Sequence, residues 1–164
     1  MADTLPQIRA FLEASGLPFE VWDCDPELAD TAVFCERYDV PLDRSANTIL
    51  VRSKTGEEAY AACVVLATTR LDVNKTVRKR LGARKASFAS ADETKAMTGM
   101  EIGGVTALAL PPDLPLWIDA AVMDCDYVIL GGGNRESKLK VVPEIFRRTP
   151  NTEIVDGLAR AADG

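Results

Sequence analysis

The second half of the chain contains Thr98-Gly-Met-Glu-Ile-Gly-Gly-Val-Thr106, then Leu114-Pro-Leu-Trp-Ile-Asp119, then Val128-Ile-Leu-Gly-Gly-Gly-Asn-Arg135. Two glycine-rich loops therefore flank one apolar, strand-like segment. Glycine allows a positive φ and lets main-chain N–H groups approach a ligand closely, so two such loops beside strands can line one pocket. This order predicts a binding site built largely from backbone.

Neither loop matches a common nucleotide-binding motif. The first loop lacks the Lys-Ser/Thr ending of a phosphate-binding P-loop. The second loop, Gly131-Gly-Gly-Asn-Arg135, lacks the Gly-x-Gly-x-x-Gly order of a dinucleotide fingerprint. Ordinary tight turns remain an alternative for either loop taken singly. We therefore expect no nucleotide cofactor, and no cofactor of any other kind.

Composition restricts the class of protein. The chain has 164 residues, of which 47% are hydrophobic, which predicts a single domain over residues 1–164. No apolar run approaches the roughly 20 residues that span a bilayer, and the first residues lack signal-peptide features, so we expect a cytoplasmic protein that does not bind membranes. The four cysteines include no Cys-x-x-Cys pair, which favours buried thiols over zinc or redox sites.

The chain contains no histidine. This excludes Ser-His-Asp and Cys-His catalysis and removes the commonest zinc ligand, so we expect no metal site. Any chemistry must use lysine, carboxylate, hydroxyl or amide side chains and backbone dipoles. Such groups suit a substrate that is already activated and needs mainly orientation and oxyanion stabilisation.

Positive charge is concentrated although the whole chain carries −6, which argues against a general DNA-binding protein. Residues 70–85 contain seven basic residues and one acidic residue, a local charge of +6. A second basic cluster follows the second glycine loop and comprises Arg135, Lys138, Lys140, Arg147 and Arg148. Both clusters could follow a phosphate backbone, and solvated helix faces account for them equally well.

Local patterns predict helices and strands that alternate without a βαβ repeat. Capping boxes are indicated at Thr4–Gln7 and Ser90–Glu93, and Asp72 is typical of a helix cap. The expected helices end at Gly16, Tyr38, Gly82 and Gly99. The expected strands are 19–22, 48–52, 60–67, 116–118, 128–130 and 139–142.

The two glycine loops and the Leu-Pro-Leu-Trp-Ile-Asp119 segment together resemble the YbaK/EbsC family, over nearly the whole chain. That family includes free-standing aminoacyl-tRNA deacylases and the editing insertion of bacterial prolyl-tRNA synthetases. The resemblance implies a mixed α/β (α+β) fold with a curved, barrel-like, largely antiparallel or mixed sheet and flanking helices. It also implies hydrolysis of the ester that joins a wrong amino acid to tRNA.

The resemblance implies that backbone amides of Gly103, Gly104 and Val105 bind near the scissile carbonyl. The chain departs from the family pattern at Asn47, which precedes Thr48-Ile-Leu-Val51 where the family has a functional lysine. Thr106-Ala107 stands where Ser-Pro is common, and Gly131 stands where some relatives have serine. Asparagine carries no charge and cannot act as a tunable base.

Our hypothesis is that Asn47 orients the aminoacyl ester while Lys138 or Arg135 supplies positive charge. The alternatives are a strand-entry role for Asn47, and a surface position on a strand edge for Lys138. Asp119 is either a pocket acceptor or a cap. The catalytic candidates are Asn47, Gly103, Gly104 and Lys138. The substrate-binding candidates are Thr48, Val105, Thr106, Asp119, Gly131, Gly132, Gly133 and Arg135. The tRNA-binding candidates are Lys75, Arg78, Lys79 and Arg84.

Two function classes remain open. The first is a metal-independent deacylase, a translation-fidelity enzyme that clears tRNA carrying a small wrong amino acid. Editing exists because a synthetase pocket discriminates by only about 1–3 kcal/mol per methylene. The second is a catalytically weak module that binds aminoacyl-tRNA or a related aminoacyl or adenosine ligand, which the loss of the lysine at Asn47 favours. Both classes have the acceptor end of aminoacyl-tRNA as partner. A synthetase partner and the choice between monomer and homodimer stay open.

Overall fold

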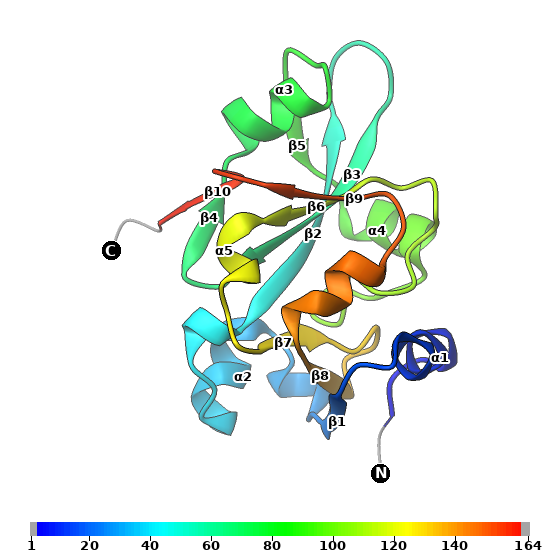
Figure 1. The fold of residues 1–164 in the computed structure, drawn as a ribbon. Helices are drawn as coiled ribbons and strands as arrows, with labels where there is room; N and C mark the ends of the chain where they lie inside the picture. The colour runs from blue at the N-terminus through cyan, green and yellow to red at the C-terminus, as the bar shows by residue number, and fades with distance from the viewer. Residues whose placement is uncertain (1–2, 162–164) are drawn as a thin grey trace.

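The computed structural model describes residues 3–161 and shows helices packed around three sheets (Figure 1). The helical elements are α1 (Pro6–Ser15), η1 (Pro26–Leu28), α2 (Thr31–Tyr38), η2 (Leu42–Arg44), η3 (Val73–Val77), α3 (Arg78–Arg80), α4 (Ala91–Thr98), α5 (Ala120–Met123) and η4 (Pro143–Arg148). The strands are β1 (Phe19–Asp23), β2 (Ala46–Ser53), β3 (Tyr60–Leu66), β4 (Thr69–Leu71), β5 (Ala86–Phe88), β6 (Leu116–Asp119), β7 (Val128–Gly131), β8 (Ser137–Val141), β9 (Thr152–Val155) and β10 (Ala159–Ala161). Within the described part of the chain, no helix has the length and apolar character to cross a membrane.

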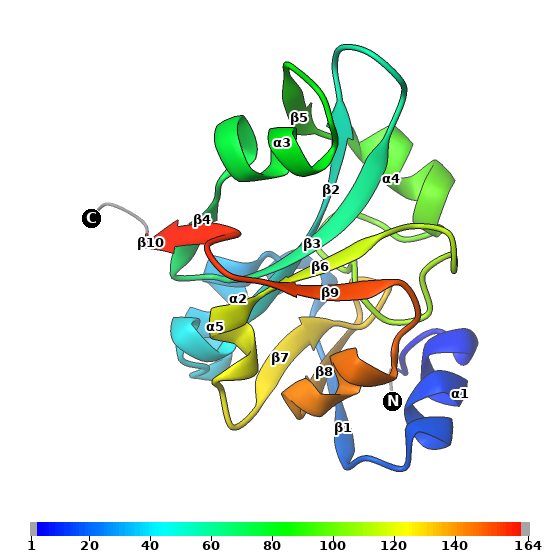
Figure 2. The same ribbon diagram turned by 45° about the horizontal axis from the view of Figure 1, so that its top comes forward.

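The largest sheet has the strand order β5-β2-β3-β6-β9. β2 pairs antiparallel with β3 and β5, whereas β3, β6 and β9 run parallel. Figure 2 shows β3, β6 and β9 side by side, with the second sheet, β1-β8-β7, below them. Residues 61–66 of β3 are all buried because both faces of this central strand are covered, which explains their unbroken apolar run. The prediction of a mixed α+β fold is confirmed.

The prediction of a barrel-like sheet is wrong. Over residues 3–161 the end strands β5 and β9 do not pair, and β1-β8-β7 forms a separate antiparallel sheet. Ser45, the residue before β2, forms an isolated bridge with Ile129 of β7. Beyond this bridge a cavity separates the two strands, so no continuous ladder can close the sheet.

Two core clusters cover the two faces of the five-stranded sheet. Leu50, Val64 and Ile118 pack toward the second sheet, while Cys63 and Trp117 pack toward η3 and β4. The prediction of buried thiols is confirmed for Cys24, Cys35 and Cys63, and Cys125 is partly exposed. Burial raises the pKa of the Cys63 thiol to about 12, so this sulfur stays protonated and unreactive.

The observed helix N-termini test the three predicted caps. The capping box of Ser90 and Glu93 is present. The predicted Thr4 cap is wrong, because α1 begins at Pro6 and the Thr4 hydroxyl donates to the Gly132 carbonyl at 2.6 Å. Asp72 stands at the predicted N-cap position, but its buried carboxylate accepts from the Thr76 hydroxyl and forms no capping bond, and the helix begins with the π-helical segment η3 before α3. A long-range contact or a local side-chain bond thus replaces each cap.

Substituting Glu93 with glutamine is expected to make Tm fall less steeply as the pH is lowered below 4.5. The Ser90 N–H, the Tyr60 hydroxyl and the Arg52 guanidinium hold the pKa of Glu93 well below 4.5, at about 2. Because the folded pKa is lowered, this stabilisation is present above pH 4.5 and is lost as pH falls from 4.5 toward 2. Tm measured against pH should show a gap between wild type and Glu93→Gln that closes over this window. Glu36→Gln, on an exposed part of α2, is the control, and a gap independent of pH would contradict the prediction.

Candidate functional site

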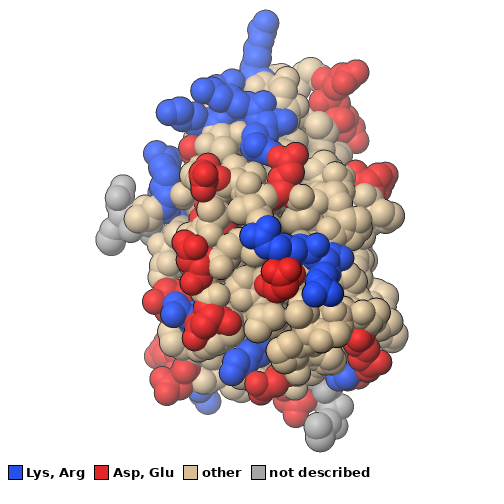
Figure 3. Space-filling view, in the orientation of Figure 1, with Lys and Arg blue, Asp and Glu red and all other residues tan. Residues whose placement is uncertain are grey.

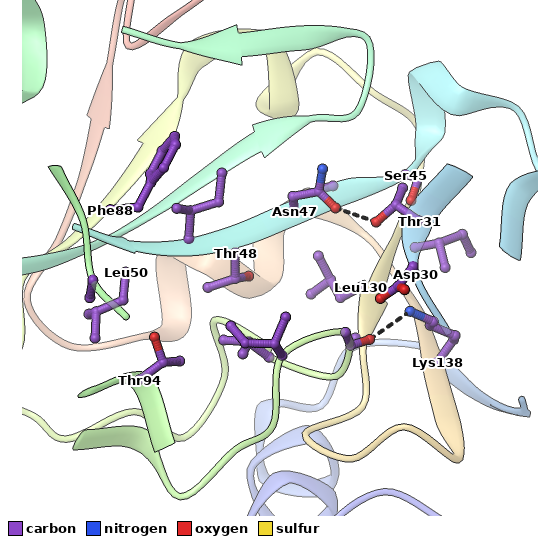
Figure 4. Close-up of a pocket in the computed structure, with 18 residues that line it drawn as sticks. Asp30, Thr31, Ser45, Asn47, Thr48, Leu50, Phe88, Thr94, Leu130 and Lys138 are labelled. Atoms are coloured by element: carbon purple, nitrogen blue, oxygen red, sulfur yellow. Dashed lines mark hydrogen bonds between the residues drawn. The ribbon is translucent and has the colours of Figure 1, made fainter. Parts of the chain in front are cut away.

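A cavity of about 390 Å³ lies between the edge of β2, the end of β5, the first glycine loop and the strands β7 and β8 (Figure 4). Its lining is mainly apolar, and Asp30 and Lys138 are the charged residues in it. The lining residues are Asp30, Thr31, Ser45, Ala46, Asn47, Thr48, Ile49, Leu50, Phe88, Ala89, Thr94, Ile102, Gly103, Val105, Ile129, Leu130, Gly131 and Lys138. This volume is within the range of small-ligand sites.

The open edge of β2 forms one wall of the cavity. β2 pairs with β5 only through Val51, Arg52 and Ser53, and the carbonyl of Leu50 accepts from the Ala89 N–H at 2.8 Å. Because main-chain groups of alternate strand residues face the same edge, Thr48 directs its N–H and carbonyl to that side too. The buried Thr48 hydroxyl has no hydrogen-bond partner among residues 3–161. This wall therefore presents polar groups that a ligand can satisfy.

Asn47 lies on this wall and is tied to α2. The Thr31 hydroxyl donates to Asn47 Oδ1 at 2.5 Å, as Figure 4 shows, which leaves the amide Nδ2 as the donor of this side chain. The partner of Asn47 is thus a side chain sixteen residues away, not the local backbone. Asp30 and Thr31 were missed as site residues, because only tertiary structure brings the start of α2 to the cavity.

The first glycine loop forms the facing wall. Gly103 and Val105 line the cavity, and within the described chain neither N–H donates a hydrogen bond. The Gly104 N–H donates to the Glu101 carbonyl at 2.9 Å, and Gly104 is outside the lining. This bond argues against Gly104 as a donor to a substrate. Thr106 is also outside the lining, with its hydroxyl buried and unpaired within residues 3–161.

The second glycine loop packs directly on the first. The Gly133 N–H donates to the Gly104 carbonyl at 2.6 Å. A Cβ at Gly131 would lie 2.6 Å from the Val105 carbonyl oxygen, so only glycine allows this approach. Gly131 lines the cavity, while Gly132 and Gly133 do not. The prediction that the two loops come together is confirmed, although Gly132 and Gly133 of the second loop lie outside the cavity surface.

Lys138 lies on β8, the central strand of the second sheet, and is only 6% exposed. Its Nζ donates to the Ala29 carbonyl at 2.6 Å and to the Gly103 carbonyl at 3.1 Å, and lies 5.1 Å from the centre of the Phe34 ring. Burial lowers the pKa of this ammonium group. The alternative of a surface lysine on a strand edge is therefore wrong. Lys138 lines the cavity, and its positive charge lies against the Gly103 carbonyl of the first glycine loop.

Arg135 and Asp119 lie outside the cavity lining. The Arg135 guanidinium donates to the Ile102 carbonyl at 2.8 Å, the Pro26 carbonyl at 3.0 Å and the Asp30 carboxylate at 3.2 Å, so it supports the first loop from behind. Asp119 accepts from the Ala159 N–H at 3.4 Å, makes no side-chain cap of α5, and burial raises its pKa. The structure thus gives neither side chain a contact with the cavity.

The basic segment, residues 70–85, gathers around η3 and α3, where Figure 3 shows blue side chains over the top of the molecule. Lys75, Lys79 and Arg84 are exposed and form no ion pair with the described residues. Arg78 is partly buried and donates to the carbonyls of Asn74 and Ala83.

The second basic cluster does not form a phosphate track. Arg135 and Lys138 are engaged as described above. Lys140 pairs with Glu20, Arg147 pairs with Glu144, and Arg148 donates to the Ser15 carbonyl. The expectation that this cluster faces the same ligand as residues 70–85 is therefore not supported. A sequence cluster only makes a surface patch when its side chains are left free.

Comparison with known proteins gives consistent results. A model of the aminoacyl-tRNA editing domain matches residues 25–149. The uncharacterized protein YwhH of Bacillus subtilis (strain 168) is 26% identical over 141 residues, which are 86% of this chain and 87% of that protein. The crystal structure of hypothetical protein APE2540 superposes with a TM-score of 0.79 at 23% identity, over 92% of this chain and 97% of that one. A candidate trans-editing enzyme for prolyl-tRNA synthetase gives 0.76 at 19% identity, over 96% and 99%. At these identities the solved structures show a shared fold.

Proposed function

Because the chain belongs to the aminoacyl-tRNA editing domain family, we propose that it hydrolyses the ester between tRNA and a small, wrongly attached amino acid. The resemblance inferred from the glycine loops is confirmed by this membership. One observation carries the proposal: Asn47 and Thr48 on one wall of the cavity face Gly103 and Val105 on the other, with the charge of Lys138 behind the loop. An acyl ester held between these walls meets donors on both sides.

The apolar lining supports an uncharged amino acid. Leu50, Ile129 and Leu130 supply contacts for a short aliphatic side chain. The Thr48 hydroxyl can accept from the amino group or donate to an ester oxygen, and the Asn47 Nδ2 can donate to an ester oxygen. These polar contacts fix orientation, which is the main requirement for an ester that is already activated.

The chemistry requires little acid–base machinery. Water adds to the ester carbonyl carbon and gives up a proton to the neighbouring ribose hydroxyl, which passes its own proton on, and the tetrahedral oxyanion collapses. The C–O bond to the ribose breaks, the leaving ribose oxygen takes up that proton, and the free amino acid leaves. The N–H groups of Gly103 and Val105 and the ammonium of Lys138 stabilise the oxyanion, a contribution worth about 3 kcal/mol for one donor in comparable sites.

Cations of the basic segment hold the tRNA. Lys75, Lys79 and Arg84 are free to contact phosphates, and Arg78 contributes charge from a more restricted position. Because phosphate contacts release counterions, binding should weaken steeply with salt. A small-ligand module would show almost no such dependence.

The test is ester loss from a panel of tRNAs charged with small wrong amino acids, measured for wild type, Asn47→Ala and Asn47→Lys. We expect wild type to deacylate at least one of them and Asn47→Ala to lower kcat/KM about 10-fold, as for one lost neutral hydrogen bond. Asn74→Ala, on the exposed surface of η3, should leave turnover unchanged. Activity found only in Asn47→Lys would make the protein a binding module and refute the proposed hydrolase.

A further inference from the structure

Two large apolar side chains stand exposed at the mouth of the cavity. Phe88, the last residue of β5, is 58% exposed, and Ile102 of the first glycine loop is 52% exposed. Both line the cavity, although they come from separate elements. Phe88 belongs to none of the described core clusters. An exposed apolar rim that belongs to none of these core clusters is typical of a ligand contact.

The cavity has two chemically different ends. Figure 4 shows Phe88 at one end and Lys138 with Asp30 at the other. The Lys138 end holds the groups that face the ester, and the Asp30 carboxylate there would repel a phosphate. The Phe88 end has an aromatic ring and no charged lining residue among those described. A nucleic acid chain therefore enters most favourably past Phe88.

Free positive charge leads directly to this entrance. β5 connects the end of the basic segment to Phe88, and three residues of extended strand place Lys85 about 10 Å from it. Arg84 and Lys85 are exposed and make no ion pair with any residue between 3 and 161. Their backbone N–H groups donate to the Thr55 hydroxyl, which fixes this corner against the β2–β3 hairpin. The cations thus lie immediately before the short strand that ends at the ring.

We propose that Phe88 is the stacking platform for the terminal base of the acceptor strand, and that Arg84 and Lys85 bind the phosphates that precede this base. Ile102 closes over the opposite side of the base. An aromatic ring beside a cationic groove is the usual solution for binding single-stranded nucleic acid, because every base offers a π-face. This inference rests on the proposed function and adds the position and orientation of the RNA.

Steady-state kinetics with a mischarged tRNA substrate test the ring. Loss of one base stack predicts that Phe88→Ala raises KM about 10-fold with little change in kcat. Phe88→Leu should show the same loss, while Phe88→Trp should restore wild-type KM. Ile154→Ala removes another exposed apolar side chain, 38% exposed on β9 away from the cavity, and should change nothing. Wild-type KM in Phe88→Leu would overturn the proposal, because the ring would then act only as an apolar cover.

A second readout does not depend on turnover. The probe is adenosine carrying alanine through a 3′-amide, which cannot be hydrolysed and has no phosphate. Wild type should bind it, Phe88→Ala should bind it about 10-fold more weakly, and the double variant Arg84→Ala/Lys85→Ala should bind it as wild type does. With tRNA, the same double variant should reduce the slope of the logarithm of the binding constant against the logarithm of salt concentration by about one to two, the effect of losing one to two phosphate contacts. Phe88-dependent binding without turnover would refute only the hydrolase, whereas no binding of the probe by wild type would overturn the stacking platform.

Discussion

Lys138→Met is expected to lower kcat/KM for ester hydrolysis by about 100-fold or more, the cost of losing an oxyanion-stabilising group in a preorganised site. The methionine side chain fills a similar volume but carries no charge. It also leaves the carbonyls of Ala29 and Gly103 without their ammonium donor. The charge behind the first glycine loop and the fixed position of that loop are lost together.

The same substitution should lower the free energy of unfolding by about 2 kcal/mol, the cost of leaving buried acceptors unsatisfied. Lys140→Met is the matched control, because Lys140 lies two residues along the same strand in a surface pair with Glu20. Exposed pairs contribute little, so this variant should lose about 0.5 kcal/mol or less and keep its activity. Full activity in a folded Lys138→Met protein would remove Lys138 from the mechanism. Initial rates measured over a range of substrate concentrations, together with urea unfolding of both variants, decide the point.

The contact between the loops could be predicted from sequence because glycine has no Cβ and therefore marks places where backbone segments can approach closely. Gly104 and Gly131 occur where backbone meets backbone, and no other residue fits there. The strand β3 could likewise be predicted from its unbroken apolar run. Such features depend on the residue itself and its immediate neighbours.

The exact roles of polar side chains could not be predicted, because distant partners decide them. Thr4 has the sequence signature of a cap, yet its hydroxyl binds Gly132, 128 positions away. Lys138 and Lys140 are two residues apart on β8, and the sequence does not distinguish them. Only Lys138 is buried, because Ala29 and the Phe34 ring of α2 pack over it. Arg135 likewise follows the second loop in sequence but supports the first loop in space.

The second prediction with a large effect concerns loop packing. Gly104→Ala should lower the free energy of unfolding by about 3 kcal/mol, the upper range for overpacking a rigid site. A Cβ there would lie 2.5 Å from the carbonyl carbon of Asn134 and closer still to its oxygen. Both atoms are backbone, so no rotation of a side chain relieves the collision. The loops must separate, which also moves Gly103 and Val105 away from their places in the cavity wall.

Gly56→Ala separates this collision from the ordinary cost of replacing glycine. Gly56 has φ +73° in the β2–β3 hairpin, and a Cβ there meets nothing within 4 Å. Its replacement should cost only about 1 kcal/mol of left-handed backbone strain and leave turnover intact. Urea unfolding of both variants gives the two free energies at unchanged m-value. Equal losses in the two would show that the loops give way without cost, whereas a larger loss at Gly104, accompanied by failing turnover, would show that loop-on-loop packing holds the cavity wall in place.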